Sequence, residues 1–501
     1  MAESTLRIAF FASMFLSGSV LFGQTDLPHE PIEIGHQPQF LLDHYVVDNH
    51  WAIKYKREAV TRIHHQAKKH AANPVLTGDQ PSFVWVIRDP ATDLFRMYYQ
   101  ANFPTGADAA GARKFRTHIA YAQSQDGIHW DKPDLDQFSW HQVEPNNVVI
   151  GRESVPAMES CGPCILEVPE SERKGFRYLM LYRSKGRGIG ELSGIRVIGS
   201  HNGVDWDQAS DRQIADLHSD HHNTVSYDEV AQKYVMFCRA KHIYRAWGDD
   251  MIDTGASRRV ARMTSDSLWN GWMDENQPQT VLVPDEIDSQ TRFNFFYGMP
   301  TRRWAGIYWG FLEPFRMNDY IYTQLATSRD GIHFTRPALR DKLIEFGDEG
   351  TWDDTMIFAS PSWVEVGDQW WIYYSGWDGP HGTSERTGAI GLATIRKEGF
   401  VSMRGPSGGG VVCTRSLRWP GGRLIVNADA SDGELKVRVS DAFRKPISGF
   451  DYHDCQPLTD DQTSHLVQWN DAKLEKLRGQ VIRLEFFIRD ADLYTFRAST
   501  D

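Results

Sequence analysis

Ser124-Gln125-Asp126-Gly127-Ile128-His129-Trp130 is a short pattern that recurs along the chain and decides the fold. Close copies are Ser200-His201-Asn202-Gly203-Val204-Asp205-Trp206 and Ser328-Arg329-Asp330-Gly331-Ile332-His333-Phe334, and a stretched copy runs from Ser265 to Trp272. Asp-Gly or Asn-Gly supplies the positive-φ residues of a tight hairpin, and the aromatic residue begins the returning strand. Each copy therefore predicts a turn between two strands, with Asp126, Asn202 and Asp330 as turn formers.

The spacing of these turns predicts a repeated architecture, because a period of tens of residues is typical of solenoids and propellers. Each turn follows a first strand, a Tyr/Trp-rich second strand and a third strand, and a fifth unit ends in the degenerate turn 396–400. The predicted first strands are residues 83–87, 164–168, 224–227, 300–304 and 362–366. Radial closure protects strand edges that an open sheet would expose, so residues 35–402 are predicted to form a five-bladed β-propeller.

The C-terminal part of the chain has a different pattern. A Gly-rich stretch at residues 405–410 is interpreted as a linker. Beyond it, residues 435–439 and 481–486 alternate between apolar and polar side chains as half-buried strands do, and 424–427, 466–469 and 493–496 add three short strands. We therefore predict an all-β chain in which the propeller is followed by a β-sandwich over residues 411–501.

Composition and the N-terminal segment restrict the partners and the location. The chain has 501 residues and a formal net charge of −12, which would repel a phosphate backbone, so nucleic acid is not an expected partner. The apolar run from Ile8 to Phe22 predicts a signal peptide over residues 1–23 and export to the periplasm or the medium. A membrane anchor is the alternative, but the run is shorter than the roughly 20 residues that span a bilayer. No later segment is predicted to enter a membrane, and the oligomeric state stays open.

The cysteines favour packing over redox or metal chemistry. There are five, namely Cys161, Cys164, Cys238, Cys413 and Cys455, so at least one is unpaired. The first two have C-x-x-C spacing, but a zinc site needs four ligands and no second cysteine pair follows. A place within or beside a strand is the preferred interpretation, and the residues themselves predict no metal ligand set and no cofactor.

Strand direction sorts the polar residues into one candidate site. In a propeller blade the first strand runs along the central channel, so the chain just before it lies at one mouth, with the loops between second and third strands. Predicted catalytic residues at this mouth are Asp79, Glu159, Asp220, His221, His222, Asp353 and Asp354. Predicted sugar-binding residues are Asn223, Arg239, Trp247, Tyr297, Glu313, Trp377 and His381.

These residue types suit the cleavage of glycosidic bonds. One carboxyl group protonates the leaving oxygen while another activates water or attacks the anomeric carbon, and an aromatic face packs against the apolar face of a sugar ring. Each acid has the alternative role of capping a turn, and either histidine has the alternative role of a structural residue. The prediction is therefore for a set that contains a catalytic pair, without a fixed assignment of acid and base.

Several stretches resemble a known group of enzymes. They are His222-Asn223-Thr224, Tyr297-Gly298-Met299-Pro300, Gly379-Pro380-His381-Gly382 and the segment from Arg489 to Phe496. With the five units and the C-terminal strands, the chain from about Phe40 to Arg497 resembles the five-bladed glycoside hydrolases related to families 32, 43 and 117. It is most similar to the bacterial family 32-like proteins that are common in planctomycetes.

The resemblance implies roles for particular positions. In related families the base, a carboxylate that tunes the pKa and the acid come from successive blades, which implies Asp79, Glu159 and Asp220 or its histidine neighbours, with Asp353 and Asp354 as alternatives. Family 117 enzymes have been proposed to use a histidine near the place of the acid. Arg88-Asp89-Pro90 resembles the Arg-Asp-Pro of family 32 but falls in the turn at the opposite mouth. Some relatives hold a cation in the central channel, so the resemblance allows a Ca²⁺ ion there.

We therefore predict a glycoside hydrolase that removes a terminal sugar from a plant or algal oligosaccharide. A propeller that binds carbohydrate without cleaving it is the first alternative. A glycoside phosphorylase is the second, and it would need a cluster of basic residues beside the acids, for which Arg239, Arg245, Arg258 and Arg259 are candidates.

Overall fold

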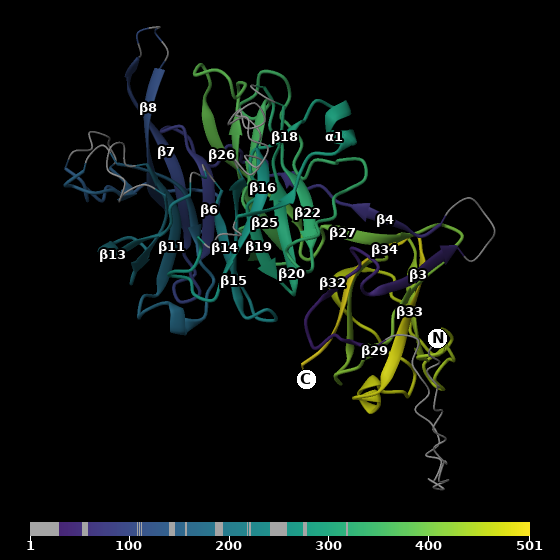
Figure 1. Cartoon of the computed structure of the whole chain (residues 1–501). Helices are drawn as coiled ribbons and strands as arrows, with labels where there is room; N and C mark the ends of the chain where they lie inside the picture. The colour runs from purple at the N-terminus through teal and green to yellow at the C-terminus, as the bar shows by residue number, and fades with distance from the viewer. Residues whose placement is uncertain are drawn as a thin grey trace, which may run out of the picture.

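The computed structural model describes residues 30–500 apart from 53–58, 108, 110, 112, 140–145, 156–157, 186–193, 218, 220–221, 241–257, 274–277 and 317–318. The predicted signal peptide, three predicted site residues, Asp220, His221 and Trp247, and the basic residue Arg245 lie outside the described residues. The described chain is all-β, as predicted, with the short α1(Glu286–Gln290) as its α-helix (Figure 1). Within the described parts, no helix is both long enough and apolar enough to cross a membrane.

Antiparallel sheets of similar composition follow one another along the chain, and Figure 1 shows them side by side on the left. The first three are β6(Ser82–Arg88)-β7(Phe95–Ala107)-β8(Arg113–Ser124)-β9(Val148–Ile150), β10(Glu159–Ile165)-β11(Tyr178–Lys185)-β12(Gly194–Ser200)-β13(Trp206–Ala215) and β14(Thr224–Asp228)-β15(Lys233–Ala240)-β16(Arg259–Ser265)-β17(Gln279–Leu282). The next two are β19(Thr301–Trp304)-β20(Ile307–Leu312)-β22(Gln324–Ser328) and β23(Met356–Ala359)-β25(Gln369–Trp377)-β26(Gly388–Arg396)-β5(Lys68–Lys69). A two-stranded ribbon, β18(Phe295–Phe296) with β21(Pro314–Phe315), lies beside the fourth of these sheets in the sequence.

The first strands of the five sheets surround one narrow cavity. Its lining includes Val84 of β6, Pro163 of β10, Thr224 of β14, Pro300 just before β19 and Phe358 of β23. The last sheet takes its fourth strand, β5, from the N-terminal side of the chain, so it joins segments more than 300 residues apart in sequence. The sequence did not predict this closing strand, because it is only two residues long and carries two lysines.

The repeated turns form at the predicted positions, and each uses the same hydrogen bonds. Of the three close copies, however, only that at residues 200–206 has an aromatic residue that begins a strand, because β13 starts at Trp206 whereas Trp130 and Phe334 lie outside the strands. The hydroxyls of Ser124, Ser200 and Ser328 accept from the glycine amide three residues later, at 2.8–2.9 Å. The Oδ1 atoms of Asp126, Asn202 and Asp330 each accept from two following amides at 2.8–2.9 Å. The structure therefore confirms these three residues as turn formers, with the positive φ angle carried by glycine alone.

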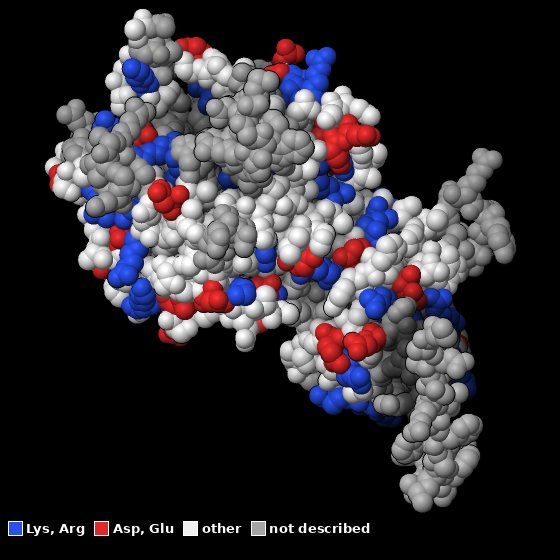
Figure 2. Space-filling view, in the orientation of Figure 1, with Lys and Arg blue, Asp and Glu red and all other residues white. Residues whose placement is uncertain are grey.

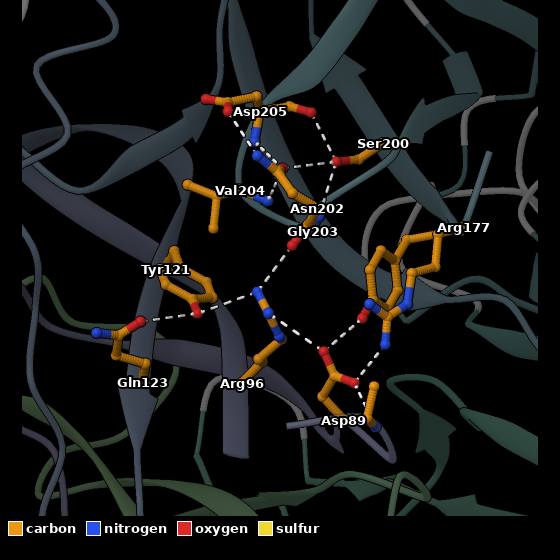
Figure 3. Close-up of polar contacts among 12 residues, drawn as sticks. Asp89, Arg96, Tyr121, Gln123, Arg177, Ser200, Asn202, Gly203, Val204 and Asp205 are labelled. Carbon is orange, nitrogen blue, oxygen red and sulfur yellow. Dashed lines mark hydrogen bonds and ion pairs between the residues drawn. The ribbon is translucent and has the colours of Figure 1, made fainter. Parts of the chain in front are cut away.

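These turns also connect neighbouring sheets. The hydroxyl of Tyr98, on β7, donates to the carbonyl oxygen of Gly203 at 2.7 Å, and that of Tyr373, on β25, donates to Gly127 at 2.8 Å. Figure 3 shows the turn at Gly203 facing Arg96 of the preceding sheet, whose guanidinium donates to the Asn202 carbonyl at 2.8 Å. Gly127 and Gly203 are therefore each needed both for the φ angle and for the close approach of a neighbouring sheet.

Replacing Gly127 by alanine should lower the free energy of unfolding by more than the strain of a positive φ angle alone. A Cβ atom at Gly127 would lie 2.7 Å from the Tyr373 hydroxyl and 3.0 Å from Phe95 and Trp371. Gly306 has a similar φ of 73° but open space around its Cβ position. In urea unfolding we expect Gly306→Ala to cost about 1 kcal/mol and Gly127→Ala about 1–3 kcal/mol more. Equal costs would show that the packing against Tyr373 contributes nothing.

The N-terminal and C-terminal strands together form two six-stranded sheets (Figure 1). One contains β1(Ile32–Glu33), β29(Leu417–Arg418), β33(Val481–Arg489), β28(Gly410–Thr414), β3(Val47–Ala52) and β31(Glu434–Asp441). The other contains β32(Asp461–Leu466), β30(Leu424–Asp429), β34(Ala491–Ala498), β27(Val401–Gly405), β4(Thr61–His64) and β2(Gln39–Phe40). An apolar core that includes Leu41, Val426, Val437, Leu484 and Phe496 draws on strands of both sheets.

The predicted domain boundaries therefore need correction. Strands β1 to β4, in residues 32–64, pair with C-terminal strands, so a boundary at residue 35 does not match the sheets. β27 also pairs with β34, and the Gly-rich stretch after it connects β27 to β28. The stretch at 405–410 is thus a turn between two C-terminal sheets, not a linker between domains.

The degenerate fifth turn lies where the two parts of the chain meet. Arg396 donates to the Asn427 side chain at 2.7 Å, and Asn427 donates to the Lys397 carbonyl at 2.8 Å. Glu398, which is buried, accepts from the Thr495 hydroxyl at 2.5 Å. This copy has lost the Asp-Gly signature and contacts β30 and β34 of the C-terminal sheets.

Three strand predictions were wrong for local reasons. The fifth first strand is β23, because Pro361 lacks an amide hydrogen and the run at 362–366 becomes the separate short strand β24(Val364–Val366). β10 starts at Glu159, before the predicted 164, and a bulge between Cys161 and Cys164 hides its alternation. Residues 467–469 follow β32 rather than forming a strand, and the Trp469 indole donates to the Val437 carbonyl in the core at 2.9 Å.

Candidate functional site

A buried carboxylate and an imidazole form the centre of the candidate site. Glu313, just after β20, is 0% exposed, and its Oε1 lies 2.5 Å from Nδ1 of His222, just before β14. The His222 side chain is 9% exposed and lines the narrow cavity between the first strands. A buried carboxylate is costly unless it is paired, and among the described residues His222 is the partner of Glu313.

Tyr297 contacts two other predicted sugar-binding residues, Arg239 and His381, and also Arg258. Its backbone amide donates to the Glu313 carbonyl at 2.7 Å. The Arg239 guanidinium lies 4.5 Å from the Tyr297 ring centroid and donates to the Tyr297 carbonyl at 2.9 Å, and Arg258 lies 4.7 Å from the same ring. His381 packs against the ring edge-on at 5.2 Å. Residues from four separate segments thus meet around one aromatic ring.

The backbone is strained on both sides of the pair. His222 has φ of 56° and Phe83 has φ of 47°, a region that bulky residues rarely adopt. The two side chains touch edge-on with ring centroids 4.5 Å apart, and Phe358 packs against both. Strain of this kind persists only where the surrounding structure imposes it, and it concentrates at functional sites. The strain therefore favours His222 as a functional residue over a structural one.

The Asp79 carboxylate is bonded to side chains of its own sheet and of the loop that follows β8. Its Oδ2 accepts from the Tyr99 hydroxyl at 2.8 Å, and its Oδ1 lies 2.7 Å from Nζ of Lys132. The last sheet repeats this arrangement with Asp353, Tyr374 and Lys69, at 2.8 and 2.6 Å. Burial, and then the nearby carboxylates, raise the pKa of Tyr99 and Tyr374, so both hydroxyls stay protonated and donate. In these positions Asp79 and Asp353 hold the segment before a first strand against the rest of its sheet.

Of the remaining predicted residues, one caps a turn and the others lie near the site. Asp354 accepts from the Gly350 amide and the Thr355 hydroxyl, both at 2.7 Å, as a turn cap does. Trp377 is buried in the aromatic cluster that contains Tyr297, and Asn223 lines the narrow cavity. Glu159 is half-buried at the start of β10, and its side chain makes no polar contact with the residues that the structure describes. Among the described residues, Glu159 is thus a carboxylate without a polar partner.

Sequence reasoning missed three residues of the site, two that contact His222 and one that contacts Trp377 and His381. Phe83 and Phe358 pack against His222, and Arg386 lies 5.0 Å from the Trp377 ring and donates to the His381 carbonyl at 2.7 Å. Phe83 was assigned to a first strand as an ordinary core residue, and Phe358 precedes the fifth first strand predicted at 362–366, so nothing in the local sequence distinguished either residue. Arg386 belongs to the same inter-strand loop as His381, a position that could have placed it in the predicted set.

Cysteine and metal chemistry gain no support from the described residues. All five cysteines are free and buried, and burial raises the pKa of the Cys413 thiol to about 11. Within the described ranges no group of three or more His, Cys, Asp or Glu side chains is placed to hold a metal ion. Figure 2 shows acidic and basic side chains interspersed on the visible face, without a continuous patch of either sign among the described residues there.

Comparison with known proteins gives distant similarities. No family model matches the chain. An uncharacterized protein of Mycobacterium tuberculosis (strain CDC 1551 / Oshkosh) is 25% identical over 162 residues, which cover 31% of this chain and 45% of that protein. The chain thus matches less than half the length of this relative.

Among solved structures, an N-acetylgalactosamine deacetylase from F. plautii is 15% identical with a TM-score of 0.42, and covers 67% of this chain and 95% of its own. A glycosyl hydrolase from Bacteroides ovatus is 15% identical with a TM-score of 0.44, and covers 69% and 97%. A β-1,2-mannobiose phosphorylase from Listeria innocua is 11% identical with a TM-score of 0.44, and covers 66% and 97%. At this distance the similarities assign no activity to the chain.

Proposed function

We propose that the chain is a glycoside hydrolase in which the five successive sheets are the blades of a propeller and the terminal strands form a β-sandwich. The observation that carries the proposal is the buried Glu313–His222 pair, which lies among aromatic rings and guanidinium groups at the start of the first strands. Acid–base groups beside aromatic faces are what the cleavage of a glycosidic bond needs. In this proposal Glu159 is the second carboxylate, because no described contact occupies it.

The shape of the site favours a chain end as the substrate. The rings of Phe83 and Phe358 pack against His222, so the channel narrows directly beyond the pair. The cavity beyond His222 has a volume of about 10 Å³, which is too small for a sugar ring, so in this proposal a chain end binds at the mouth and does not pass into the channel. We therefore propose removal of a terminal sugar from plant or algal oligosaccharides, as the sequence predicted.

A panel of plant and algal oligosaccharides tests the proposal. We expect the wild-type chain to release a monosaccharide from at least one of them, as measured by chromatography. Glu313→Gln should lose that release, whereas Glu365→Gln should keep it, because Glu365 is an exposed residue of β24 that pairs with Lys397. Binding of an oligosaccharide by calorimetry without any release would instead favour the non-catalytic carbohydrate-binding propeller.

Phosphorolysis is the second candidate, because two guanidinium groups, those of Arg239 and Arg258, stack on Tyr297 beside Glu313. Guanidinium groups bind phosphate through paired hydrogen bonds. The same panel with and without inorganic phosphate separates the two reactions. A free sugar in both conditions identifies hydrolysis, and a sugar 1-phosphate that forms only with phosphate identifies phosphorolysis.

A further inference from the structure

We propose that Arg386 binds an anionic group carried by the sugar, so that this site takes acidic oligosaccharides that bear a carboxylate or a sulfate. This inference rests on the proposed function and names the substrate class of the same site. Three features of Arg386 carry it. They are its place beside Trp377 and His381, the edge of its guanidinium group that no described residue occupies, and the lack of an ion pair with any described carboxylate.

The loop between β25 and β26 places Arg386 at the site. Trp377 and Gly388 lie opposite each other on these two strands, and a Cβ atom at residue 388 would lie 2.9–3.0 Å from the Trp377 ring. Arg386 comes two residues before Gly388, and its guanidinium lies 5.0 Å from the centroid of the same ring. The glycine thus leaves room for the indole ring, and the indole ring supports the guanidinium.

Hydrogen bonds hold this guanidinium by one of its nitrogens. Nη1 of Arg386 donates to the carbonyl oxygens of Pro380 and His381, at 3.1 and 2.7 Å. The His381 amide donates to the Asp319 carbonyl at 3.1 Å, which joins this loop to the neighbouring one. Nε and Nη2 of Arg386 have no hydrogen bond to the described residues. The edge that carries Nε and Nη2 is therefore not used by the described part of the chain.

This edge of a guanidinium group matches an anion with two oxygens. Two parallel N–H groups bind two oxygens of one carboxylate or sulfate, and such charged, paired bonds are stronger than neutral single ones. The chain uses the same edge elsewhere, since Nε and Nη2 of Arg404 donate to the Asp492 carboxylate at 3.1 and 2.5 Å. An acidic sugar would offer Arg386 the same pair of oxygens that Asp492 offers Arg404.

Arg386 also differs in its charge balance from comparable arginines of the last two sheets. Arg316, Arg336 and Arg340 are half-buried like Arg386, and each forms an ion pair with an aspartate. Burial lowers the pKa of Arg386, and the group that opposes this shift is the Tyr297 phenol and not a carboxylate. A partly buried cation is costly without an anionic partner. A ligand carboxylate or sulfate would supply that partner in the bound state.

Calorimetry with matched sugars tests the anion site separately from catalysis. The probes are galacturonate and glucuronate oligosaccharides, a sulfated galactan oligosaccharide, the neutral galactose and glucose oligosaccharides, and inorganic phosphate. We expect the wild-type chain to bind at least one acidic oligosaccharide about 10-fold or more tightly than its neutral counterpart. Arg386→Gln should weaken this binding about 10- to 100-fold, because it removes hydrogen bonds to a charged group. Binding of neutral sugars alone, of phosphate alone, or of no acidic oligosaccharide would overturn the inference.

Two further variants separate charge recognition from a purely structural role. Arg316→Gln is the matched control, because Arg316 also lies over an aromatic ring, that of Tyr320 at 4.6 Å, but pairs with Asp319. It should leave the preference for acidic sugars unchanged. Arg386→Lys keeps the charge without the paired donors, so it should recover part of the lost affinity. If Arg386→Gln weakened acidic and neutral ligands equally, Arg386 would have only a structural role.

Sugar release then separates this inference from the proposed function. On an acidic substrate that the wild type cleaves, Arg386→Gln should lower kcat/KM about 10- to 100-fold, mainly through KM. Binding of acidic oligosaccharides without release of any sugar would overturn the proposed function and leave the anion site standing. Release of sugar from neutral oligosaccharides alone would support the proposed function and overturn the role of Arg386.

Discussion

Glu159→Gln should lower kcat about 100- to 10,000-fold on any oligosaccharide that the wild-type chain cleaves, which is the range that a positioned general base contributes. Glu159 is the first residue of β10 and is half-buried, and its side chain makes no polar contact with the described residues. Asp79 and Asp353, in contrast, each form an ion pair with a lysine and accept a hydrogen bond from a tyrosine hydroxyl. Of these three predicted carboxylates, Glu159 is the one without a partner among the described residues, which is why the proposed function uses it as the base.

A matched control for this variant is Glu167→Gln. Glu167 follows the same strand at its other end, is exposed, and pairs with Arg302 at 2.6 Å, so this control makes the same chemical change away from the proposed site. Initial rates of sugar release and the free energy of unfolding should be measured for both variants. A Glu159→Gln enzyme within threefold of the wild-type kcat would remove Glu159 from the reaction and return the assignment to Asp79 or Asp353.

The local repeats could be predicted from the sequence, because their information lies within seven residues. The serine, the Asp or Asn, and the glycine of each turn bond to one another, so Asp126 or Asp330 needs no distant partner to form its turn. The direction of the first strands then follows from the turns. That direction was sufficient to bring His222, Tyr297, Glu313, Arg239 and His381 into one predicted set before any contact was known.

Pairings between distant segments could not be predicted in this way. β5 joins the last sheet through Lys68 and Lys69, and β1 to β4 join the C-terminal sheets. Edge strands need hydrogen-bonding partners, but the local sequence does not indicate which distant segment will supply them. The same limit explains Asp79, whose position before a strand fits catalysis and turn capping equally well. The structure decides it, because the Tyr99 hydroxyl and Lys132, which is 53 residues later in the chain, both bond to the Asp79 carboxylate.

Asp89→Asn should lower the free energy of unfolding by about 3 kcal/mol or more, the largest stability effect that we expect from a single substitution here. Asp89 resembles a catalytic residue by its Arg-Asp-Pro context, yet its side chain is 0% exposed in the turn after β6. Figure 3 shows it between Arg177 and Arg96. Its Oδ2 lies 3.2 Å from the Arg96 guanidinium and 2.8 Å from the Tyr178 hydroxyl. Removing its charge would leave two guanidinium groups without their shared carboxylate.

The effect of Asp89→Asn should depend on pH in a defined direction. Burial alone would raise the pKa of Asp89, but hydrogen bonds from the Ala91 amide and Tyr178, and then the charges of Arg177 and Arg96, hold it below its usual range. Because the pKa is lower in the folded than in the unfolded state, the carboxylate stabilises the fold above about pH 4 and loses this contribution as the pH falls through the folded value. At pH 7, urea unfolding should therefore give a lower free energy of unfolding for Asp89→Asn than for the wild type, and this difference should shrink below about pH 4.

Asp93→Asn is the matched control. This exposed carboxylate of the same turn pairs only with Arg88 among the described residues, so its loss should change the free energy of unfolding by less than about 1 kcal/mol. If the two variants were equally stable at pH 7, the bonds of Asp89 to the neighbouring sheet would contribute no stability, and its Arg-Asp-Pro context would again require a functional explanation.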